Sequence, residues 1–395
     1  MERILFLSHM YPTTLDKDYG KVIHEQALSL VRLGYEVKVI CPVPHTFKML
    51  KYVNKKYEKY ISLPQKEIHE GIEVYYPRYW RLPKQILLET EFKRLYKPVK
   101  KIVEQELSEF SFDLIHAHFG YPDGKAAELL AEDYQVPFNI TLQSTDLDKT
   151  IYKSQQMKKI IVENFQNANQ VIVPSPRLKR KLELQTSVTA SFIGYGIDLD
   201  SVRKENTDLK QPKFVDSFNI VSIGRLLSTK GFDYSILAMK EIVNKYPNVK
   251  LYVIGAGPEE EELKKLISEN GLNDYIELLG GLEHSVAMEY LSVADIFLLP
   301  SWQETFGLVY AEAMANGVLT IGCEGQGFDG IIKDKENGLL VAPKSSQSIV
   351  DAIHFVLNNE AVAMEIAEKG KKTVESTLTF EKIAEQIGEI YQSLE

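Results

Sequence analysis

The stretch SWQETFGLVYAEAMANGV, residues 301–318, predicts a turn and a helix directly after a strand. It follows the apolar run 296–299, which Pro300 ends, so we expect a buried strand that leaves its sheet at the carboxyl end. From Phe306 onward the spacing of apolar residues is helical, and Gly317 stands where a C-terminal cap is expected. In an open α/β sheet, ligands bind at such a turn.

Two carboxylates frame this turn: Glu304 precedes the predicted helix, and Glu312 lies two turns into it. Eight residues of helical rise would separate them by roughly 12 Å, whereas a glycosidase acid/base pair stands no more than about 9.5 Å apart. Between them, the backbone N–H groups around Gly307 and Leu308 favour an anion. A ligand with hydroxyls at both ends and phosphate in the middle, such as a nucleotide-sugar, has this layout. For either Glu alone, an ordinary exposed carboxylate near a helix start is the simpler interpretation.

Length and composition indicate a globular protein of two domains. At 395 residues the chain exceeds the usual size of one core, and its 44% hydrophobic and 26% charged residues are ordinary values. Cys41 and Cys323 stand at strand-like positions in different halves, which predicts a reducing compartment rather than a disulfide framework. The apolar opening 4–7 is too short for a signal peptide and no later run reaches spanning length, so we expect a cytoplasmic protein.

Charge is distributed unevenly along the chain, whose net charge is −9. Residues 1–205 carry 30 Lys/Arg against 26 Asp/Glu, and residues 206–395 carry 16 against 29. Residues 45–103 hold 14 basic and 6 acidic side chains, a patch suited to anionic lipid or an anionic acceptor. The acidic second half disfavours nucleic-acid binding.

Two basic helical patterns lie within this patch. Residues 46–61 place aromatic and aliphatic side chains at helical spacing among lysines, and residues 84–107 form a second long pattern that Pro98 is expected to interrupt. Amphipathic segments of this kind fit a membrane surface. They fit equally well an ordinary solvated helix packed on its own domain, and both interpretations stay open.

Strand-like runs alternate with helical patterns from end to end. They lie at 3–8, 37–41, 113–118, 137–142, 170–174 and 189–193, and then at 218–224, 249–255, 276–280, 295–299, 318–323 and 338–343. The polar stretch 200–213 has no periodicity and is predicted to be a linker. We predict an α/β protein with two doubly wound, Rossmann-like parallel-sheet domains facing a central cleft, the default active site. The predicted parts are 1–200, a linker at 201–216, and 217–376.

Two cations stand at the first strand-to-helix turn of the second half, SIGRLLSTKGFDY. Arg225 and Lys230 follow the strand 218–224, and Gly224 and Gly231 relieve the backbone there. A planar Arg fork and a Lys point charge at the carboxyl edge of a sheet suit a diphosphate. Either cation alone would be interpreted as a solvated loop charge. Together with the Glu304 turn at the same predicted edge, they favour a binding site.

These segments carry a resemblance to a known family. In order they are IGRLLSTKGFDYSILAMK (223–240), VIGAGPEEEELKKL (253–266), ADIFLLPSWQETFGLVYAEAMANGVLTIG (294–322) and NGLLV (337–341). They resemble the nucleotide-binding domain of retaining GT-B glycosyltransferases of glycosyltransferase family 4. ILFLSHMYP (4–12), HAHFGYPDGKAA (116–127) and ITLQSTDLD (140–148) are similar to that family's acceptor domain. The resemblance covers nearly the whole chain and is nearest to bacterial polysaccharide and teichuronic-acid-type enzymes.

The resemblance implies a role for each matching residue. Arg225 and Lys230 would bind the diphosphate and stabilise its growing charge as the glycosidic bond breaks. Glu304 would hold hydroxyls of the donor sugar, and Glu312 the ribose hydroxyls. The other residues expected at the donor are Gly20, Gln143, Asp146, Gly224, Phe306, Gly307 and Leu308. The final helix, 377–395, would cross back onto the first domain.

The implied reaction moves a hexose-type sugar from a nucleotide-sugar, with UDP as the expected nucleotide, to a glycan or lipid-linked acceptor. Its setting would be synthesis of cell-surface polysaccharide or glycoconjugate at the inner membrane face. The family retains the anomeric configuration by front-face attack, in which the leaving phosphate helps to deprotonate the acceptor. No cofactor, metal or enzyme nucleophile is expected, so catalysis would rest on positioning and on stabilising the leaving group.

Two departures from the family pattern bear on activity. In place of a His-Gly-Ser-Asp-like segment the chain has residues 143–146, where Gln143 can hydrogen-bond a sugar hydroxyl but carries no charge. In place of an acid before the apolar pair 331–332 it has Gly330, next to Asp329. A second function therefore stays open, a catalytically silent GT-B scaffold that binds nucleotide or a partner without transfer.

Other motifs are weaker evidence for a function. Gly255-Ala256-Gly257 resembles a dinucleotide fingerprint but lacks its third glycine. The Asp-x-Asp strings at 146–148 and 198–200 are common by chance, and we expect no metal there. His116 and His118 are expected to be structural, although an acceptor-side role for His118 stays open. Two distant cysteines give no zinc spacing.

Overall fold

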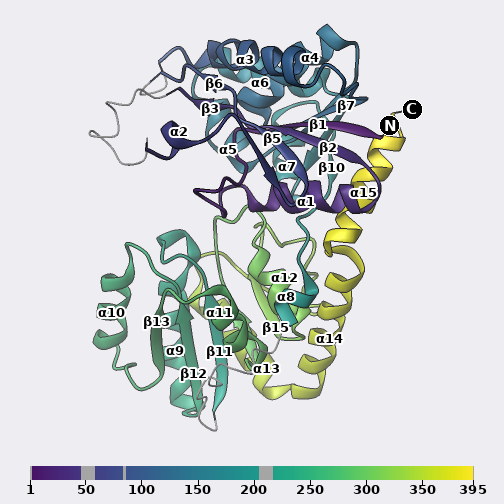
Figure 1. Cartoon of the computed structure of the whole chain (residues 1–395). Coiled ribbons are helices and arrows are strands. Elements are labelled where there is room, and N and C mark those ends of the chain that lie inside the picture. The colour runs from purple at the N-terminus through teal and green to yellow at the C-terminus, as the bar shows by residue number, and fades with distance from the viewer. Residues whose placement is uncertain (1, 46–57, 83–85, 204–216, 395) are drawn as a thin grey trace. The chain divides into compact units, whose positions relative to one another are not determined.

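The structure, a computed structural model of the whole chain, describes residues 2–45, 58–82, 86–203 and 217–394. The chain forms two compact units (Figure 1). Unit 1 comprises Met1–Pro174, Leu178–Gly196 and Phe380–Glu395, and unit 2 comprises Ser175–Arg177 and Ile197–Thr379. Of the linker predicted at 201–216, residues 204–216 lie outside the described residues, and 201–203 belong to helix α8 (Leu199–Arg203) in unit 2.

Unit 1 is built on an eight-stranded sheet with the order β10-β9-β8-β7-β1-β2-β5-β4. The strands are β1 (Arg3–Leu7), β2 (Glu36–Ile40), β4 (Lys66–His69), β5 (Ile72–Tyr75), β7 (Leu114–His118), β8 (Phe138–Thr141), β9 (Gln170–Val173) and β10 (Ser191–Phe192). All neighbours are parallel except β4 and β5, which pair antiparallel at one edge. The central strands β1, β7 and β8 are almost wholly buried, as expected for parallel strands covered on both faces.

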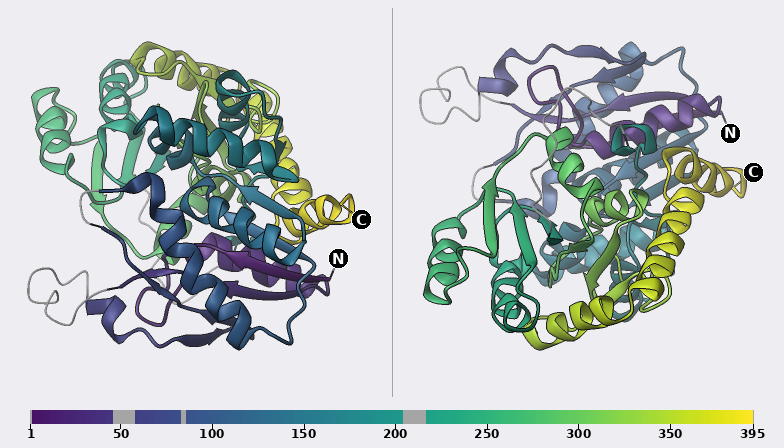
Figure 2. Two further views of the ribbon diagram at one scale, coloured as in Figure 1. Left: turned by 90° about the horizontal axis from the view of Figure 1, so that it is seen from above. Right: turned by 90° about the horizontal axis from the view of Figure 1, so that it is seen from below.

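Helices cover both faces of this sheet (Figure 1). On one face α3 (Glu91–Glu106), α4 (Lys125–Tyr134) and α6 (Gln155–Asn167) pack together, and on the other α1 (Lys21–Arg32) packs against α15 (Phe380–Gln392). The smaller elements are β3 (Val43–Pro44), β6 (Arg78–Tyr79), α2 (Glu58–Ser62), α5 (Ser144–Asp148) and α7 (Pro176–Gln185). In both views of Figure 2, the end of α15 lies near the start of β1. Buried Tyr391 of α15 is hydrogen-bonded to Nδ1 of His116 in β7 at 2.5 Å, which fixes this closing helix to the sheet.

The basic segments of unit 1 differ from the sequence prediction. α3 runs through Pro98 instead of being interrupted by it. A proline inside a helix costs about 3 kcal/mol, but Leu95, Val99 and Val103 are buried on both sides of it, and this packing keeps the helix continuous. Of the pattern at 46–61, residues 46–57 lie outside the described residues, and the rest begins α2.

The edge hairpin β4–β5 was not expected from the sequence. Its turn residues Glu70 and Gly71 both have positive φ, 47° and 89°. That backbone matches the twist of a two-residue hairpin, for which glycine at the second position is favourable. The signal is short and lies inside a polar stretch, so alternation of strands and helices alone does not reveal it.

Unit 2 is built on a six-stranded, fully parallel sheet with the order β13-β12-β11-β14-β15-β16. The strands are β11 (Phe218–Ile223), β12 (Val249–Ile254), β13 (Ile276–Gly280), β14 (Ile296–Leu298), β15 (Leu319–Cys323) and β16 (Leu339–Val341). The long helices are α9 (Phe232–Lys245), α10 (Glu260–Glu269), α11 (His284–Ser292), α12 (Leu308–Ala315), α13 (Ser346–Asn358) and α14 (Glu360–Thr377). Of these, α9 contacts α10 and α13, whereas α12 contacts α11 and α14, so the helices form two layers.

The strand order reverses direction at β11, because β12 and β13 lie on one side of it and β14 to β16 on the other. This is the switch point where open α/β sheets bind ligands, beyond the carboxyl ends of the strands. Two doubly wound parallel-sheet domains were predicted, and this prediction is confirmed. Among the described residues, no helix has both the length and the hydropathy needed to cross a membrane.

Candidate active site

The Glu304 turn and the Arg225 turn meet at the switch point of unit 2. β11 and β14 are neighbours in the sheet, so the loops at their carboxyl ends emerge side by side. Lys230, in the 3₁₀ turn Ser228–Lys230, forms an ion pair with the Glu304 carboxylate, although 74 residues separate them. The two side chains are 19% and 13% exposed, so the pair is largely shielded and still reachable by a ligand.

Glu304 is held by three further contacts, two to its backbone and one to its carboxylate. Arg177 donates from Nε to the Glu304 carbonyl at 3.1 Å, and the Glu304 N–H donates to the Gln326 side-chain carbonyl at 3.3 Å. The Thr305 N–H donates to the Glu304 carboxylate itself at 3.1 Å. These contacts fix the turn before α12, so the carboxylate is oriented in the absence of a ligand.

α12 begins at Leu308 because Gly307 occupies its N-cap with φ 92°, a left-handed conformation. A Cβ at Gly307 would lie 2.5 Å from the Tyr310 ring, so only glycine fits there. The Tyr310 hydroxyl donates to the Leu299 carbonyl at 2.7 Å and ties the helix start to the end of β14. Phe306 is buried with its ring edge-on to Phe328 at 5.1 Å, so only its backbone is available to a ligand.

Glu312 is paired with a residue that the sequence analysis missed. Nε2 of His284 lies 2.9 Å from Glu312 Oε1, and the two side chains are 61% and 15% exposed. His284 is the first residue of α11, on the helix preceding β14 in the chain. A histidine at a helix start is a common surface feature, so no sequence signal marked it. Arg177 and Gln326 were also missed, because each lies far along the chain from Glu304, which it contacts.

Arg225 is exposed, and within the described part of the chain its guanidinium has no ion-pair partner. Two glycines directly after the neighbouring strand β12 leave room for the loop that carries Arg225. A Cβ at Gly255 would lie 1.8 Å from the Gly224 carbonyl oxygen, and one at Gly257 would lie 2.2 Å from the Leu226 carbonyl oxygen. The Gly-Ala-Gly string therefore makes room for the Arg225 turn, which accounts for it without a dinucleotide.

Gly330 has φ 105°, and a Cβ there would lie 3.1 Å from Pro176. An acidic side chain at this position would be strained, which explains the departure from the family pattern in physical terms. Neighbouring Asp329 accepts a hydrogen bond from the Gly325 N–H at 2.6 Å and so closes the loop on itself.

The remaining predicted site residues, Gly20, Gln143 and Asp146, lie in unit 1. Gly20 has φ 81°, and a Cβ there would lie 2.8 Å from the backbone of Met10 and Tyr11. The Gln143 side-chain carbonyl accepts a hydrogen bond from the Tyr195 hydroxyl at 2.6 Å. Asp146 is buried and closes a capping box with Gln143 at the start of α5.

The Asp146 carboxylate receives the backbone N–H groups of Gly120, Tyr121 and Gln143 at 2.9, 3.3 and 2.9 Å. Burial raises its pKa to about 6, although these N–H groups lower it. Asp146 thus organises two loops of unit 1 at the carboxyl ends of β7 and β8. Asp148, the second acid of the same Asp-x-Asp string, forms an ion pair with Lys181 at 2.5 Å. In the other string, Asp198 accepts the Asp200 N–H at 3.0 Å.

His116 and His118 are structural in their contacts. They stack at 4.6 Å, and His116 uses both ring nitrogens, on Tyr391 and on Thr141. Burial lowers the pKa of His116 to about 3 and that of His118 well below its ordinary value. Nε2 of His118 is buried without a hydrogen-bond partner in the described residues.

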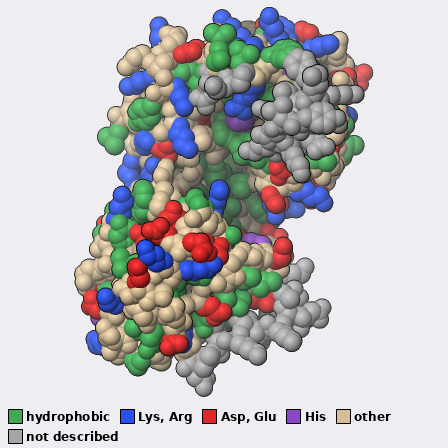
Figure 3. All heavy atoms as spheres, turned by 90° about the vertical axis from the view of Figure 1, so that its left-hand side faces the viewer, with side chains coloured by type: hydrophobic (Ala, Val, Ile, Leu, Met, Phe, Trp, Pro, Cys, Tyr) green, Lys and Arg blue, Asp and Glu red, His purple; other side chains and the backbone are tan. Residues whose placement is uncertain are grey.

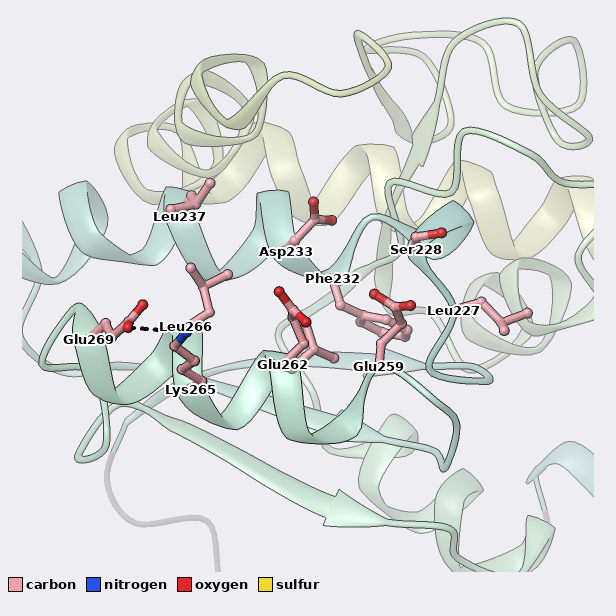
Figure 4. Close-up of a pocket in the computed structure, with 11 residues that line it drawn as sticks. Leu227, Ser228, Phe232, Asp233, Leu237, Glu259, Glu262, Lys265, Leu266 and Glu269 are labelled. Carbon is pink, nitrogen blue, oxygen red and sulfur yellow. Dashed lines mark ion pairs between the residues drawn. The ribbon is translucent and has the colours of Figure 1, made fainter.

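A cavity of about 330 Å³ lies between α9 and α10, beside the 3₁₀ turn of Lys230 (Figure 4). The carboxylates of Asp233, Glu259 and Glu262 project into it, and burial raises the pKa of Asp233. This acidic lining repels a diphosphate. The Lys230–Glu304 turn is therefore the better candidate site for an anionic ligand.

Comparison with known proteins identifies the family. Residues 203–373 match the family model of the glycosyl transferases group 1, and residues 20–201 match that of glycosyltransferase family 4. The chain belongs to these glycosyltransferases. TuaC of Bacillus subtilis, named as a teichuronic acid biosynthesis glycosyltransferase, is 29% identical over 99% of this chain and 98% of its own length. The alpha-monoglucosyldiacylglycerol synthase of Acholeplasma laidlawii is 26% identical over 84% of this glycosyltransferase and 82% of its own length.

Solved structures show the fold. Sucrose-phosphate synthase from Thermosynechococcus elongatus has a TM-score of 0.73 at 21% identity, covering 100% of this glycosyltransferase and 99% of that chain. HepE from Anabaena, solved in complex with UDP, has a TM-score of 0.73 at 18% identity and covers 100% of both chains. These likenesses confirm the predicted GT-B fold.

Proposed function

We propose that this glycosyltransferase moves a hexose-type sugar, with retention of configuration, from a UDP-sugar to a glycan or lipid-linked acceptor. The observation that carries the proposal is the Lys230–Glu304 pair at the switch point, beside exposed Arg225. Two cations suit a diphosphate, and a fixed carboxylate suits sugar hydroxyls. The likeness to TuaC and to the alpha-monoglucosyldiacylglycerol synthase supports a setting in cell-surface polysaccharide or glycolipid synthesis. HepE, which binds UDP, supports UDP as the nucleotide.

The roles follow the chemistry of each group. Arg225 and Lys230 hold the diphosphate and stabilise the charge that grows on it, Glu304 holds the sugar, and Glu312 with His284 holds the ribose. Fixed cations take the part that a divalent metal plays elsewhere, so we propose a metal-independent reaction without a cofactor. Retention follows if the acceptor attacks from the face that the diphosphate leaves, with the leaving phosphate helping to take the proton.

We further propose that the enzyme is cytoplasmic and docks on the inner membrane face through residues 45–103. Trp80, Ile86 and Leu87 of unit 1 are 49%, 55% and 60% exposed. Arg94 links the two segments that carry them, because it donates to the carbonyls of Trp80 at 2.9 Å and Leu87 at 3.1 Å. Lys93, Lys97 and Lys101 are exposed along α3 next to it. On the face drawn in Figure 3, Lys and Arg side chains are spread over unit 1, whereas on unit 2 Asp and Glu side chains lie among Lys and Arg side chains.

Vesicle flotation tests the membrane part. We expect the protein to float with phosphatidylglycerol vesicles and not with phosphatidylcholine vesicles, because a basic surface with apolar side chains binds anionic lipid. Leu87→Ser should weaken flotation, whereas Leu184→Ser, at an 87% exposed site of α7, should not. Absence of flotation with the anionic vesicles would remove the membrane part and leave the transferase part standing.

The second candidate is a silent GT-B scaffold, favoured by neutral Gln143 and by Gly330, which stands where the family pattern has an acid. Thermal unfolding with UDP, GDP or ADP, in EDTA and in Mg²⁺, tests nucleotide binding. A nucleotide at about 100 times its Kd should add roughly 2.7 kcal/mol to the free energy of unfolding. We expect UDP to raise Tm in EDTA, Glu312→Ala to abolish the rise and exposed Glu261→Ala to keep it. Turnover then decides between the candidates, since a scaffold releases no UDP from any UDP-sugar.

A further inference from the structure

A basic surface of unit 1 lies outside the residues that were given a functional role above. It is carried by the 3₁₀ turn η6 (Thr150–Tyr152) with the helix α6 that follows it, and by α7. We call it the η6–α7 surface and define it by residues 148–163 and 178–185, all of which belong to unit 1. These residues include seven Lys/Arg and three Asp/Glu. Such a local excess of cations attracts an anionic partner.

The carboxylates of this surface leave several of its lysines unneutralised. Each carboxylate faces a lysine of the same surface, in the pairs Asp148–Lys181 at 2.5 Å, Glu163–Lys159 at 3.7 Å and Glu183–Lys179 at 3.9 Å. Lys149, Lys153 and Lys158 are exposed and form no ion pair with any residue that the structure describes. Their ammonium groups are therefore available to an anionic ligand.

An exposed aromatic ring stands among these lysines. Tyr152 is the last residue of η6, directly before Lys153, and is 64% exposed. Gln185 donates from Nε2 to the Tyr152 hydroxyl at 2.6 Å, and Lys181 Nζ lies 5.7 Å from the centre of the ring. These two contacts hold the ring in place although most of it faces solvent. A side chain that is fixed before binding loses little conformational freedom when a ligand arrives.

The turn that carries the ring is itself anchored to the domain. Ile151 is 2% exposed and belongs to the hydrophobic core of unit 1. The Thr150 hydroxyl donates to the Thr145 carbonyl at 3.0 Å and so ties η6 to α5. The Asp148–Lys181 ion pair ties the end of α5 to α7. The ring and its flanking lysines thus stand on a fixed support.

The charge and the ring together define the ligand. An ammonium group binds a carboxylate, and the electron-rich face of a tyrosine ring binds the polarised C–H groups on one side of a sugar ring. Because Lys149 and Lys153 flank Tyr152 on one turn, the charges of the ligand must lie next to the ring that stacks, as the carboxylate of a uronic acid does.

A membrane fits this surface less well. Among its described residues, Tyr152 and Leu184 are the exposed large apolar side chains, which is too few for the apolar face of a membrane-binding helix. The groups of the η6–α7 surface therefore favour a soluble, charged carbohydrate over a lipid bilayer.

We propose that the η6–α7 surface binds an anionic glycan, with a sugar ring on Tyr152 and carboxylates of the glycan on Lys149 and Lys153. This rests on the transferase function proposed above, for which it names the acceptor class, a glycan whose sugars carry carboxylates. The surface holds the glycan and takes no part in the chemical step.

Isothermal titration with tetragalacturonic acid, in the absence of a donor, tests the inference, and maltotetraose is the neutral probe of the same length. We expect tetragalacturonic acid to bind at least about tenfold more tightly than maltotetraose, because the neutral glycan forms no ion pairs. The double variant Lys149→Gln/Lys153→Gln should weaken binding about three- to thirtyfold, since it removes two ion pairs with the glycan. Tyr152→Ala should weaken it about three- to tenfold, and Tyr152→Phe, which keeps the ring, should weaken it less.

The matched control is Lys265→Gln/Lys372→Gln, which makes the same change of net charge at side chains of unit 2 that are 72% and 69% exposed. It should change the affinity for tetragalacturonic acid by less than about twofold. Flotation with phosphatidylglycerol vesicles separates a glycan from a membrane, and we expect Lys149→Gln/Lys153→Gln to float as the wild type does.

Three results would overturn the inference and leave the transferase proposal intact. They are no binding of tetragalacturonic acid, equal affinity for the two glycans, and loss of flotation in Lys149→Gln/Lys153→Gln with unchanged glycan affinity. A wild type that binds tetragalacturonic acid but releases no UDP from any UDP-sugar would overturn the transferase proposal, and with it the assignment of the glycan as acceptor.

Discussion

Replacing Glu304 by Gln should have opposite effects on UDP binding and on sugar transfer. In the structure Lys230 is neutralised by the Glu304 carboxylate, and the side chains are only 19% and 13% exposed. UDP must share Lys230 with that carboxylate. The isosteric amide removes the competing charge and keeps the shape of the turn, so the diphosphate meets a full positive charge.

The magnitude follows from Coulomb's law. A phosphate oxygen in contact with Lys230 would lie about 6 Å from the Glu304 carboxylate, and at an effective dielectric constant of about 40 their repulsion is about 1.4 kcal/mol. Removing it should tighten UDP binding about tenfold. The sugar loses a hydrogen bond to a charged acceptor, worth about 1.5–3 kcal/mol, so turnover of the UDP-sugar should fall about 10- to 100-fold.

Isothermal titration with UDP and a coupled assay of UDP release measure the two effects. Glu336→Gln is the matched control, because it makes the same change of net charge at an exposed Lys333–Glu336 pair, 63% and 61% exposed. It should change UDP affinity by less than about twofold. If Glu304→Gln binds UDP no more tightly than wild type, Lys230 does not hold the diphosphate and the assignment of this turn is wrong.

Three further predictions concern single features. Gly307→Ala should destabilise the protein by about 1–3 kcal/mol more than Gly280→Ala in chemical unfolding, since both glycines have positive φ but only a Cβ at Gly307 meets a ring at 2.5 Å; equal losses would show that the Tyr310 contact is unimportant. Arg225→Gln should weaken UDP binding about tenfold and reduce its salt dependence with little change in Tm, because the side chain is exposed; unchanged affinity would exclude Arg225 from the site. Between pH 7.5 and 5.5, unit 1 should lose about 2.7 kcal/mol of stability through His116 and His118, which bind protons only when unfolded and each contribute about 1.4 kcal/mol over this range; Asp146, whose pKa is raised to about 6, and His9, whose pKa is raised, offset part of this loss because they bind protons more readily when folded, and an identical Tm at both pH values would contradict the prediction.

The sequence is sufficient to predict two parallel-sheet domains and the strand-to-helix turns of the candidate site, because buried parallel strands are continuous apolar runs separated by helical patterns. The exact ends of the helices are harder to predict from the sequence. α12 starts at Leu308 rather than at Phe306 because Gly307 takes a left-handed conformation at the N-cap. α3 passes through Pro98 because packing of its buried face outweighs the missing hydrogen bond.

Part of the candidate site can be predicted from the sequence. The sequence predicts that Lys230 and Glu304 share one sheet edge, and the structure brings them into contact. The contacts of Arg177 and His284 are long-range, across 127 and 28 residues, and depend on side-chain placement that no local pattern encodes.

The most direct test of the central claim is ¹H NMR of the sugar released from a UDP-sugar by hydrolysis in EDTA, recorded before mutarotation. UDP-glucose, an α-linked donor, is the first choice, and Glu304→Gln is the blank. We expect UDP to be released without metal and α-glucose to appear first. Release of β-glucose first would contradict retention, and release of UDP only in the presence of Mg²⁺ would contradict the role of Arg225 and Lys230 as the groups that hold the diphosphate.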